Sequence, residues 1–141
     1  MSRYRNESEF NREWSAWLEA AGAKVLPLVG STYQPAGWPD RHVSHRAFVG
    51  WVEGKKDDRQ LTAAQRIVCK ELCERGDPAL ELKLLSDVED LVVKSPWGRA
   101  LATVSRARLV GSPDLKPGRI LLETLAAAWE DLRGEQPWRR L

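Results

Sequence analysis

The 141-residue chain has little of several features that would assign it to a special class. It has only two cysteines, which excludes the dense disulfide framework of a small secreted domain. Its most apolar stretch, residues 120–129, is short and contains Glu123 and Thr124, so a membrane span is not expected. Residues 1–10 are polar and charged rather than signal-like, and we therefore expect a cytoplasmic protein.

A strong charge of either sign is also missing. The net charge is +2, although 30% of the residues are charged. A mildly basic surface is compatible with nucleic-acid binding but does not require it. With 43% hydrophobic residues and neither internal repeats nor low-complexity segments, the sequence predicts one domain with a substantial core.

The two cysteines lie four residues apart on a predicted helix. Cys69 and Cys73, with His42 and His45, are enough in number for a zinc site, but their spacing matches no compact zinc motif. Packing as small apolar side chains is the better interpretation of the cysteines.

Periodicity and capping signals predict the elements of the first two thirds of the chain. A helix stops at Gly22, and two capping boxes, Thr62 with Gln65 and Ser86 with Glu89, open later helices. In chain order we expect a helix at 8–21, strands at 24–29, 41–44 and 47–54, a helix at 62–75, a strand at 80–85 and a helix at 86–93, with a loop at 30–39.

These elements give the order α-β-β-β-α-β-α, which predicts an α/β fold with a mixed central sheet flanked by helices. We expect residues 1–97 to form this core. Residues 98–141 would be a C-terminal extension, packed on the core or forming a dimer interface. It contains a strand or strand pair at 99–110 and an apolar-faced helix at 119–133.

The hairpin of the strands expected at 41–44 and 47–54 carries the most informative polar residues. Glu53 and Lys55 lie two apart on a strand and point to the same face, and the turn brings Asp40 roughly opposite them. Two carboxylates and an ammonium on an apolar sheet are costly unless a cation or a reaction uses them.

The residues around this patch resemble the PD-(D/E)xK nuclease superfamily. The likeness rests on Gly37, Pro39 and Asp40, then Glu53 and Lys55, then Leu61, Thr62 and Gln65. Within the superfamily it is greatest to the VRR-NUC group and to archaeal-type Holliday junction resolvases, and it covers about residues 7–93. It implies a restriction-endonuclease-like core and metal-dependent hydrolysis of phosphodiester bonds.

The resemblance assigns the catalytic roles. Asp40 and Glu53 would bind Mg²⁺ or Mn²⁺, with the carbonyl of Gly54 as a third ligand, and hard cations of this kind prefer oxygen. Lys55 would orient the attacking water and stabilise the developing negative charge. Gly54 is less usual at this position than an apolar residue and is expected to loosen the strand slightly.

Two further residues are candidates at the edge of the site. Gln65 matches a family glutamine that holds the lysine or the substrate, but its amide also suits the capping box with Thr62.

An acid from the first helix often completes such a site. The apolar stripe of the helix places Glu7 nearer the buried edge than Glu9. The register of the family points instead to Asn11 or Glu13, and Glu7 is our choice. The alternative for Glu7 is a solvated acid favoured by the helix dipole.

Basic residues surround the motif and are candidates for contacts with phosphates, although solvated surface charge explains them equally well. They are Arg41, Arg46, Lys56, Arg59 and Arg66. Trp38 and Trp51 are better read as core residues than as base-stacking ones.

The sequence therefore predicts a metal-dependent DNA endonuclease, with branched DNA among its candidate substrates. The alternatives are a catalytically inactive nucleic-acid-binding or assembly module, and a structural ion pair between Lys55 and one of the carboxylates. By the resemblance we also expect a homodimer, joined through the helix at 119–133 or a tryptophan-rich surface.

Overall fold

The computed structural model describes residues 6–27, 36–111 and 116–139. In chain order the elements are α1 (Glu7–Ala20), β1 (Lys24–Pro27), β2 (Arg41–His45), β3 (Phe48–Lys56), α2 (Ala63–Glu74), β4 (Ala79–Leu85), β5 (Asp90–Lys94), β6 (Ala100–Ser105), α3 (Arg106–Gly111), α4 (Pro117–Glu135) and the short 3-10 helix η1 (Pro137–Arg139). Most of the loop expected at 30–39 lies outside the described residues. None of the described helices is both long and apolar enough to cross a membrane.

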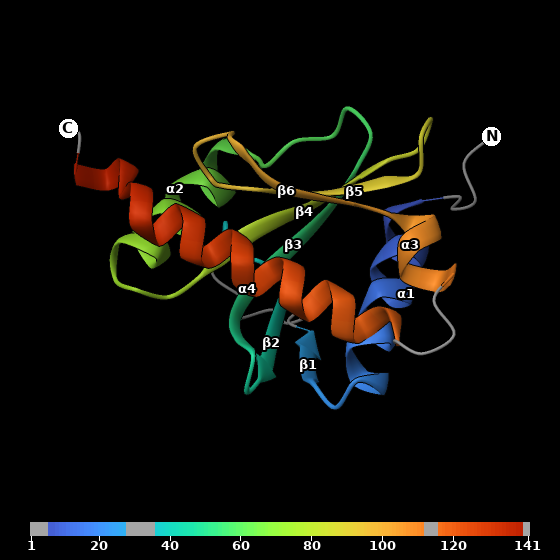
Figure 1. The fold of residues 1–141 in the computed structure, drawn as a ribbon. Helices are drawn as coiled ribbons and strands as arrows, with labels where there is room; N and C mark the ends of the chain where they lie inside the picture. The colour runs from blue at the N-terminus through green and yellow to red at the C-terminus, as the bar shows by residue number, and fades with distance from the viewer. Residues whose placement is uncertain (1–5, 28–35, 112–115, 140–141) are drawn as a thin grey trace.

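The strands form one six-stranded sheet in which the spatial order equals the chain order. β3 and β4 are parallel and are joined by α2, whereas every other neighbouring pair is antiparallel. The long helix α4 crosses one face of this sheet beside α1 (Figure 1). The predicted class, a mixed sheet flanked by helices, is confirmed.

The two faces of the sheet bury different kinds of side chain. Gly54 of β3 faces α1, and the residue opposite it on β4, Leu82, is fully buried. Because side chains alternate along a strand, Glu53 and Lys55 point to the other face. Cys69 of α2 lies near Glu53 and Glu81, whose charges act on its thiol, so α2 covers that second face. The polar site thus lies on the α2 side.

Local signals predicted the first two long helices well. α1 begins and ends within one residue of the expected helix, and Gly22 follows it with a positive φ of 94°. At the start of α2, the backbone N–H of Thr62 donates to Gln65 Oε1 at 3.0 Å, and the N–H of Gln65 donates to Thr62 Oγ1 at 3.1 Å. Both bonds of the predicted capping box are therefore present.

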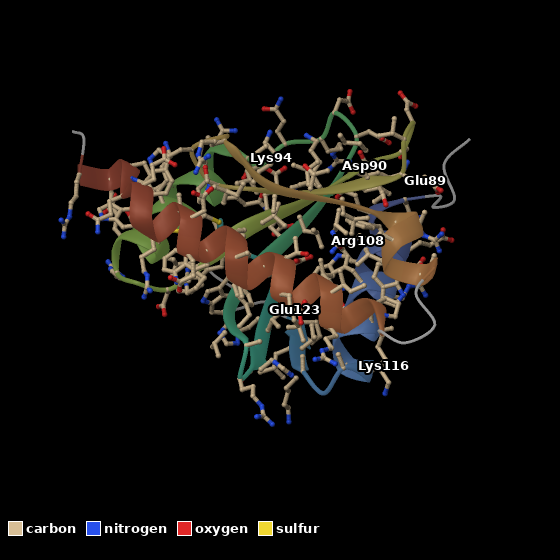
Figure 2. The ribbon with its side chains drawn as sticks, viewed as in Figure 1. Glu89, Asp90, Lys94, Arg108, Lys116 and Glu123 are labelled. Carbon is tan, nitrogen blue, oxygen red and sulfur yellow. The ribbon has the colours of Figure 1, made fainter. Side chains whose placement is uncertain are left out.

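The helix expected at 86–93 is wrong, because this segment forms a turn followed by strand β5. The N–H and the hydroxyl of Ser86 both donate to the carboxylate of Asp57, at 2.8 and 2.9 Å. In a capping box the backbone N–H of Ser86 would donate to the side chain of Glu89, but here it donates to Asp57. Glu89 itself adopts a positive φ of 51°. Glu89 and Asp90 lie at the tip of the β4–β5 hairpin (Figure 2).

The tail differs partly from expectation. The strand or strand pair expected at 99–110 is one strand, β6, followed by helix α3, while the helix expected at 119–133 is α4. The predicted boundary after residue 97 falls in the turn between β5 and β6. Leu121, Leu125 and Leu132, on the apolar face of α4, are at most 1% exposed within the single chain. That face is therefore not available as a dimer contact.

Close packing of α4 on α1 generates a stability prediction. A methyl group on Gly118 would lie 1.8 Å from the backbone oxygen of Trp17, whereas one on Gly134 of the same helix would meet nothing within 4 Å. We expect Gly118→Ala to lower the free energy of unfolding by about 1–3 kcal/mol. The matched control Gly134→Ala should raise it by about 0.5–1 kcal/mol, because alanine favours helix. Urea unfolding of the two variants checks this, and equal effects would contradict the packing.

Candidate active site

Asp40, Glu53 and Lys55 meet at one point of the sheet. Arg41 pairs with Val52 across β2 and β3, which places Asp40 opposite Glu53. The backbone N–H of Asp40 donates to Glu53 Oε1 at 3.2 Å. Glu53 and Lys55 are each only 6% exposed. The register of a short hairpin thus assembles the three predicted residues in a desolvated setting.

Burial and mutual repulsion set the electrostatics of the two carboxylates. The pKa of Glu53 is raised to about 7, chiefly by burial and then by the charge of Asp40, while the charge of Lys55 lowers it. Burial also raises the pKa of Asp40, against the lowering influence of Arg41 and Lys55. Two acids held this close favour a bound cation or a shared proton.

Arg41 is the direct partner of Asp40. Its Nη1 lies 2.9 Å from Asp40 Oδ2, and its guanidinium carbon lies 5.6 Å from the centre of the Trp14 ring. The Arg41 side chain is only 13% exposed. The predicted phosphate contact of Arg41 therefore stays a prediction, and the structure adds a role in orienting Asp40.

Gly54 lacks a side chain for a reason of packing. A methyl group there would meet Asn11 Oδ1, which accepts a hydrogen bond from Trp14 Nε1 at 2.9 Å. The glycine therefore lets α1 approach the strand between the two catalytic candidates. We expected Gly54 to loosen strand β3, and the structure shows instead a close contact between this strand and α1. The role of the Gly54 carbonyl as a metal ligand stays a prediction.

Glu7, the first residue of α1, lies at the edge of the site. Its Oε1 accepts a hydrogen bond from the backbone N–H of Lys56 at 3.4 Å and lies 3.7 Å from Arg59 Nε. The charge of Glu7 also contributes to the raised pKa of Glu53. The two residues to which the family register points are used elsewhere: Asn11 packs on the strand, and Glu13 forms an ion pair with Arg106 at 2.9 Å.

The remaining predicted residues fall into three places. Gln65 closes the capping box, and its other predicted role, at the edge of the site, stays a prediction. Lys56 and Arg59 lie beside Glu7, with Arg66 exposed on α2. Arg46 lies in the β2–β3 turn, at the opposite end of the hairpin from Glu53, so the structure does not bring it to the site.

Two buried charged residues of β4 were missed from the sequence. Glu81 pairs in parallel register with Glu53, and Lys83 with Lys55, so β4 carries a second acid and lysine on the same face. They are 5% and 8% exposed, and Lys83 Nζ donates to the carbonyl oxygen of Arg59 at 2.9 Å. The available signal was a Glu-x-Lys spacing inside an otherwise apolar strand.

The cysteines belong to the core. Cys69 and Cys73 are each 1% exposed, and burial raises the pKa of both thiols to about 12. Their interpretation as packing residues is confirmed. No group of three or more His, Cys, Asp or Glu side chains within the described residues could hold a metal ion by itself.

The donor set nevertheless fits a hard cation that keeps part of its water shell. Asp40 Oδ1 is buried and has no hydrogen-bond partner among the described residues. Glu53 lies beside it with a pKa that burial and the charge of Asp40 both raise. Mg²⁺ is usually bound by one or two protein carboxylates together with water and substrate oxygens. Asp40 and Glu53 match that requirement.

Comparison with known proteins supports the fold. No protein-family model and no curated protein sequence matches the chain. Among solved structures, the fold is similar to that of Hjc, a Holliday junction resolvase from the archaeal hyperthermophile Archaeoglobus fulgidus. The TM-score is 0.50 at 14% sequence identity, covering 71% of this chain and 88% of the resolvase chain. At this identity the likeness concerns the fold, and it confirms a restriction-endonuclease-like architecture.

The raised pKa of Glu53 predicts a pH dependence of stability. Between its ordinary value of 4.5 and about 7, the folded chain holds a proton that the unfolded chain has released. The free energy of unfolding therefore falls as the pH rises through this window, by about 3 kcal/mol in total. Glu53→Gln removes the titrating group, so its stability relative to wild type should increase by that amount between pH 4.5 and 8.

Urea unfolding in a metal-free buffer that contains a chelator measures this difference. Glu71→Gln, at an exposed position of α2, is the matched control. Parallel pH profiles for wild type and Glu53→Gln would contradict the predicted electrostatics.

Proposed function

We propose that the chain is a metal-dependent endonuclease that hydrolyses DNA phosphodiester bonds. The observation that carries the proposal is the convergence of Asp40, Glu53 and Lys55 on one buried patch. The resolvase-like fold supports it, because a protein with that architecture acts on a branched DNA. We propose branched DNA as the substrate class and, as predicted from the sequence, membership of the PD-(D/E)xK superfamily close to the VRR-NUC group.

Each residue has a distinct role in this proposal. Asp40 and Glu53, with the Gly54 carbonyl, hold Mg²⁺ or Mn²⁺, which when bound supplies positive charge at the phosphoryl oxygens and makes a water more acidic. Lys55 positions the water and stabilises negative charge on the phosphate. Arg41 holds Asp40 in place, and Glu7 binds the backbone at the end of β3. Lys56, Arg59 and Arg66 contact flanking phosphates.

A homodimer is part of the proposal, since a single site cuts one strand and a branched substrate offers two. The apolar face of α4 is buried within the chain, so the contact uses another surface. Two chains related by a two-fold axis would present two such sites.

Loss of the lysine or of the strand carboxylate should abolish cleavage without unfolding the protein. We expect Lys55→Ala and Glu53→Gln each to reduce the cleavage rate at least about a hundredfold. The assay incubates labelled four-way junction, flap, linear duplex and single-stranded RNA with Mg²⁺ or Mn²⁺. Lys24→Ala, at an exposed lysine of β1, is the control and should cut normally.

The same panel separates the alternatives. Undiminished cleavage by both variants would refute the assignment of the site. Binding without cleavage by wild type in every metal would instead favour an inactive nucleic-acid-binding module.

Metal binding should stabilise the folded chain through Asp40. At a metal concentration about 100 times the dissociation constant, wild type should gain about 2.7 kcal/mol in the free energy of unfolding. Asp40→Asn should lose most of this gain, whereas Asp77→Asn, at an exposed turn position, should keep it. Thermal unfolding with and without MgCl₂ or MnCl₂ measures the effect, and equal gains for wild type and Asp40→Asn would contradict it.

A further inference from the structure

The sheet face that carries the proposed catalytic residues continues across β4 and β5. Glu81 of β4 lies opposite Glu53, and Lys94 of β5 lies opposite Glu81. Neighbouring strands are about 4.8 Å apart, so Glu81 is one strand away from the site. Glu81 is not part of the motif on which the proposed function rests.

Glu81 has a buried oxygen without a hydrogen-bond donor. The residue is 5% exposed, and its Oε2 has no hydrogen-bond partner among the described residues. Lys83, two residues along, uses its ammonium on the carbonyl of Arg59. An acceptor buried in this way is destabilising unless a donor reaches it. Burial raises the pKa of this carboxylate against the charges of Lys83 and Lys94, and an N–H group of a ligand would supply the missing donor.

A cavity lies next to this carboxylate. It has a volume of about 210 Å³ and is lined by Glu81 and Lys94 of the sheet, Leu61 and Arg66 around the start of α2, and Trp97 of the β5–β6 turn. Figure 2 labels Lys94, which lies away from Lys116 at the start of α4. The volume is several times the ~30 Å³ share of a water molecule, which suits a planar ring.

The turn that presents Trp97 is held by its own hydrogen bonds. Ser95 is 2% exposed, and its Oγ accepts from the backbone N–H groups of Trp97 and Arg99, both at 3.2 Å. Gly98 closes the turn with a φ of 90° and donates to the Ser95 carbonyl at 2.9 Å. The indole also packs against Trp138. The turn that carries Trp97 is thus ordered, and Lys70 Nζ lies 5.8 Å from the centre of the Trp97 ring.

These groups define the chemistry of the ligand. A carboxylate accepts hydrogen bonds from N–H donors and repels phosphate. Tryptophan stacks on flat rings, and Arg66 and Lys94 suit the phosphates of the same nucleotide. A nucleobase combines a flat ring, N–H donors on its Watson–Crick edge and an attached phosphate.

We propose that this cavity takes an unpaired nucleobase adjacent to the cleavage site, with Glu81 accepting its N–H groups and Trp97 stacking on its ring. The inference rests on the proposed function, to which it adds a means of choosing substrates. Guanine is the expected favourite, because its adjacent N1–H and N2–H donors match the two oxygens of a carboxylate. Bases at a branch or bulge are already unpaired and so cost less to extrude than bases in a duplex.

Equilibrium binding with a chelator present tests the pocket without cleavage. The probes are fluorescently labelled duplexes, either fully paired or with one unpaired guanine, adenine, cytosine, thymine or abasic nucleotide. By fluorescence anisotropy, wild type should bind the guanine probe about tenfold more tightly than the thymine probe. The abasic probe should bind no better than the paired duplex.

Two variants separate recognition from stacking. Glu81→Gln, which replaces one acceptor with a donor, should lose the preference for guanine and keep its affinity for paired duplex. Trp97→Leu should weaken binding of every unpaired base without changing their order. Glu71→Gln is the control and should behave as wild type. Equal binding of all probes by wild type, or an unchanged order in Glu81→Gln, would overturn the proposal.

Adding Mg²⁺ or Mn²⁺ to the same probes distinguishes this proposal from the function on which it rests. Cleavage without any base preference would refute the pocket and leave the nuclease intact. A base preference in binding without cleavage would support the pocket and refute the nuclease. If the chain neither binds nor cuts these DNAs, the pocket proposal fails, and cleavage of the four-way junction and flap then decides the nuclease proposal.

Discussion

The parallel pairing of β3 with β4 sets the electrostatics of the whole site. It places Glu53 beside Glu81 and Lys55 beside Lys83, and all four residues are buried. Along each strand the charges have opposite sign, but across the pair like charges face each other, which is an unfavourable arrangement. Apolar residues at these positions would build a more stable sheet. The buried charges therefore depart from what stability alone favours, and departures of this kind are expected at functional sites.

A series of contacts links Asp40 to the helix α1, which packs on the opposite face of the sheet. Arg41 pairs with Asp40 and lies over the ring of Trp14, whose indole N–H binds Asn11, and Asn11 packs on Gly54. A polar residue on one face is thereby connected to the helix that covers the opposite face. These contacts link the Asp40 carboxylate to α1, and support of this kind is what a site needs to present two acids to a cation in a defined geometry.

The features that could be predicted from the sequence depend on short separations along the chain. The capping box of Thr62 and Gln65 involves residues three apart, and the hairpin that joins Asp40 to Glu53 spans 13 positions. The errors arose where a distant residue decided the outcome. Asp57 takes the donors of Ser86 from 29 positions away and turns an expected helix start into a hairpin. Glu81 was missed for the same reason. It lies beside Glu53 only because β3 and β4 pair in parallel, and α2 separates these two strands in the sequence.

The order of the strands also has a consequence for how the chain folds. Within the described residues, β1 to β3 and β4 to β6 are two sets of antiparallel neighbours that contact residues near them in sequence. Contacts of this kind close small loops and form early, whereas the β3–β4 pairing must close a loop that contains α2. Each half can therefore become ordered while the row of buried charges is still incomplete. The complete row of Glu53, Glu81 and Lys94 arises only when the halves dock, so a chain arrested before that step has secondary structure but lacks this arrangement.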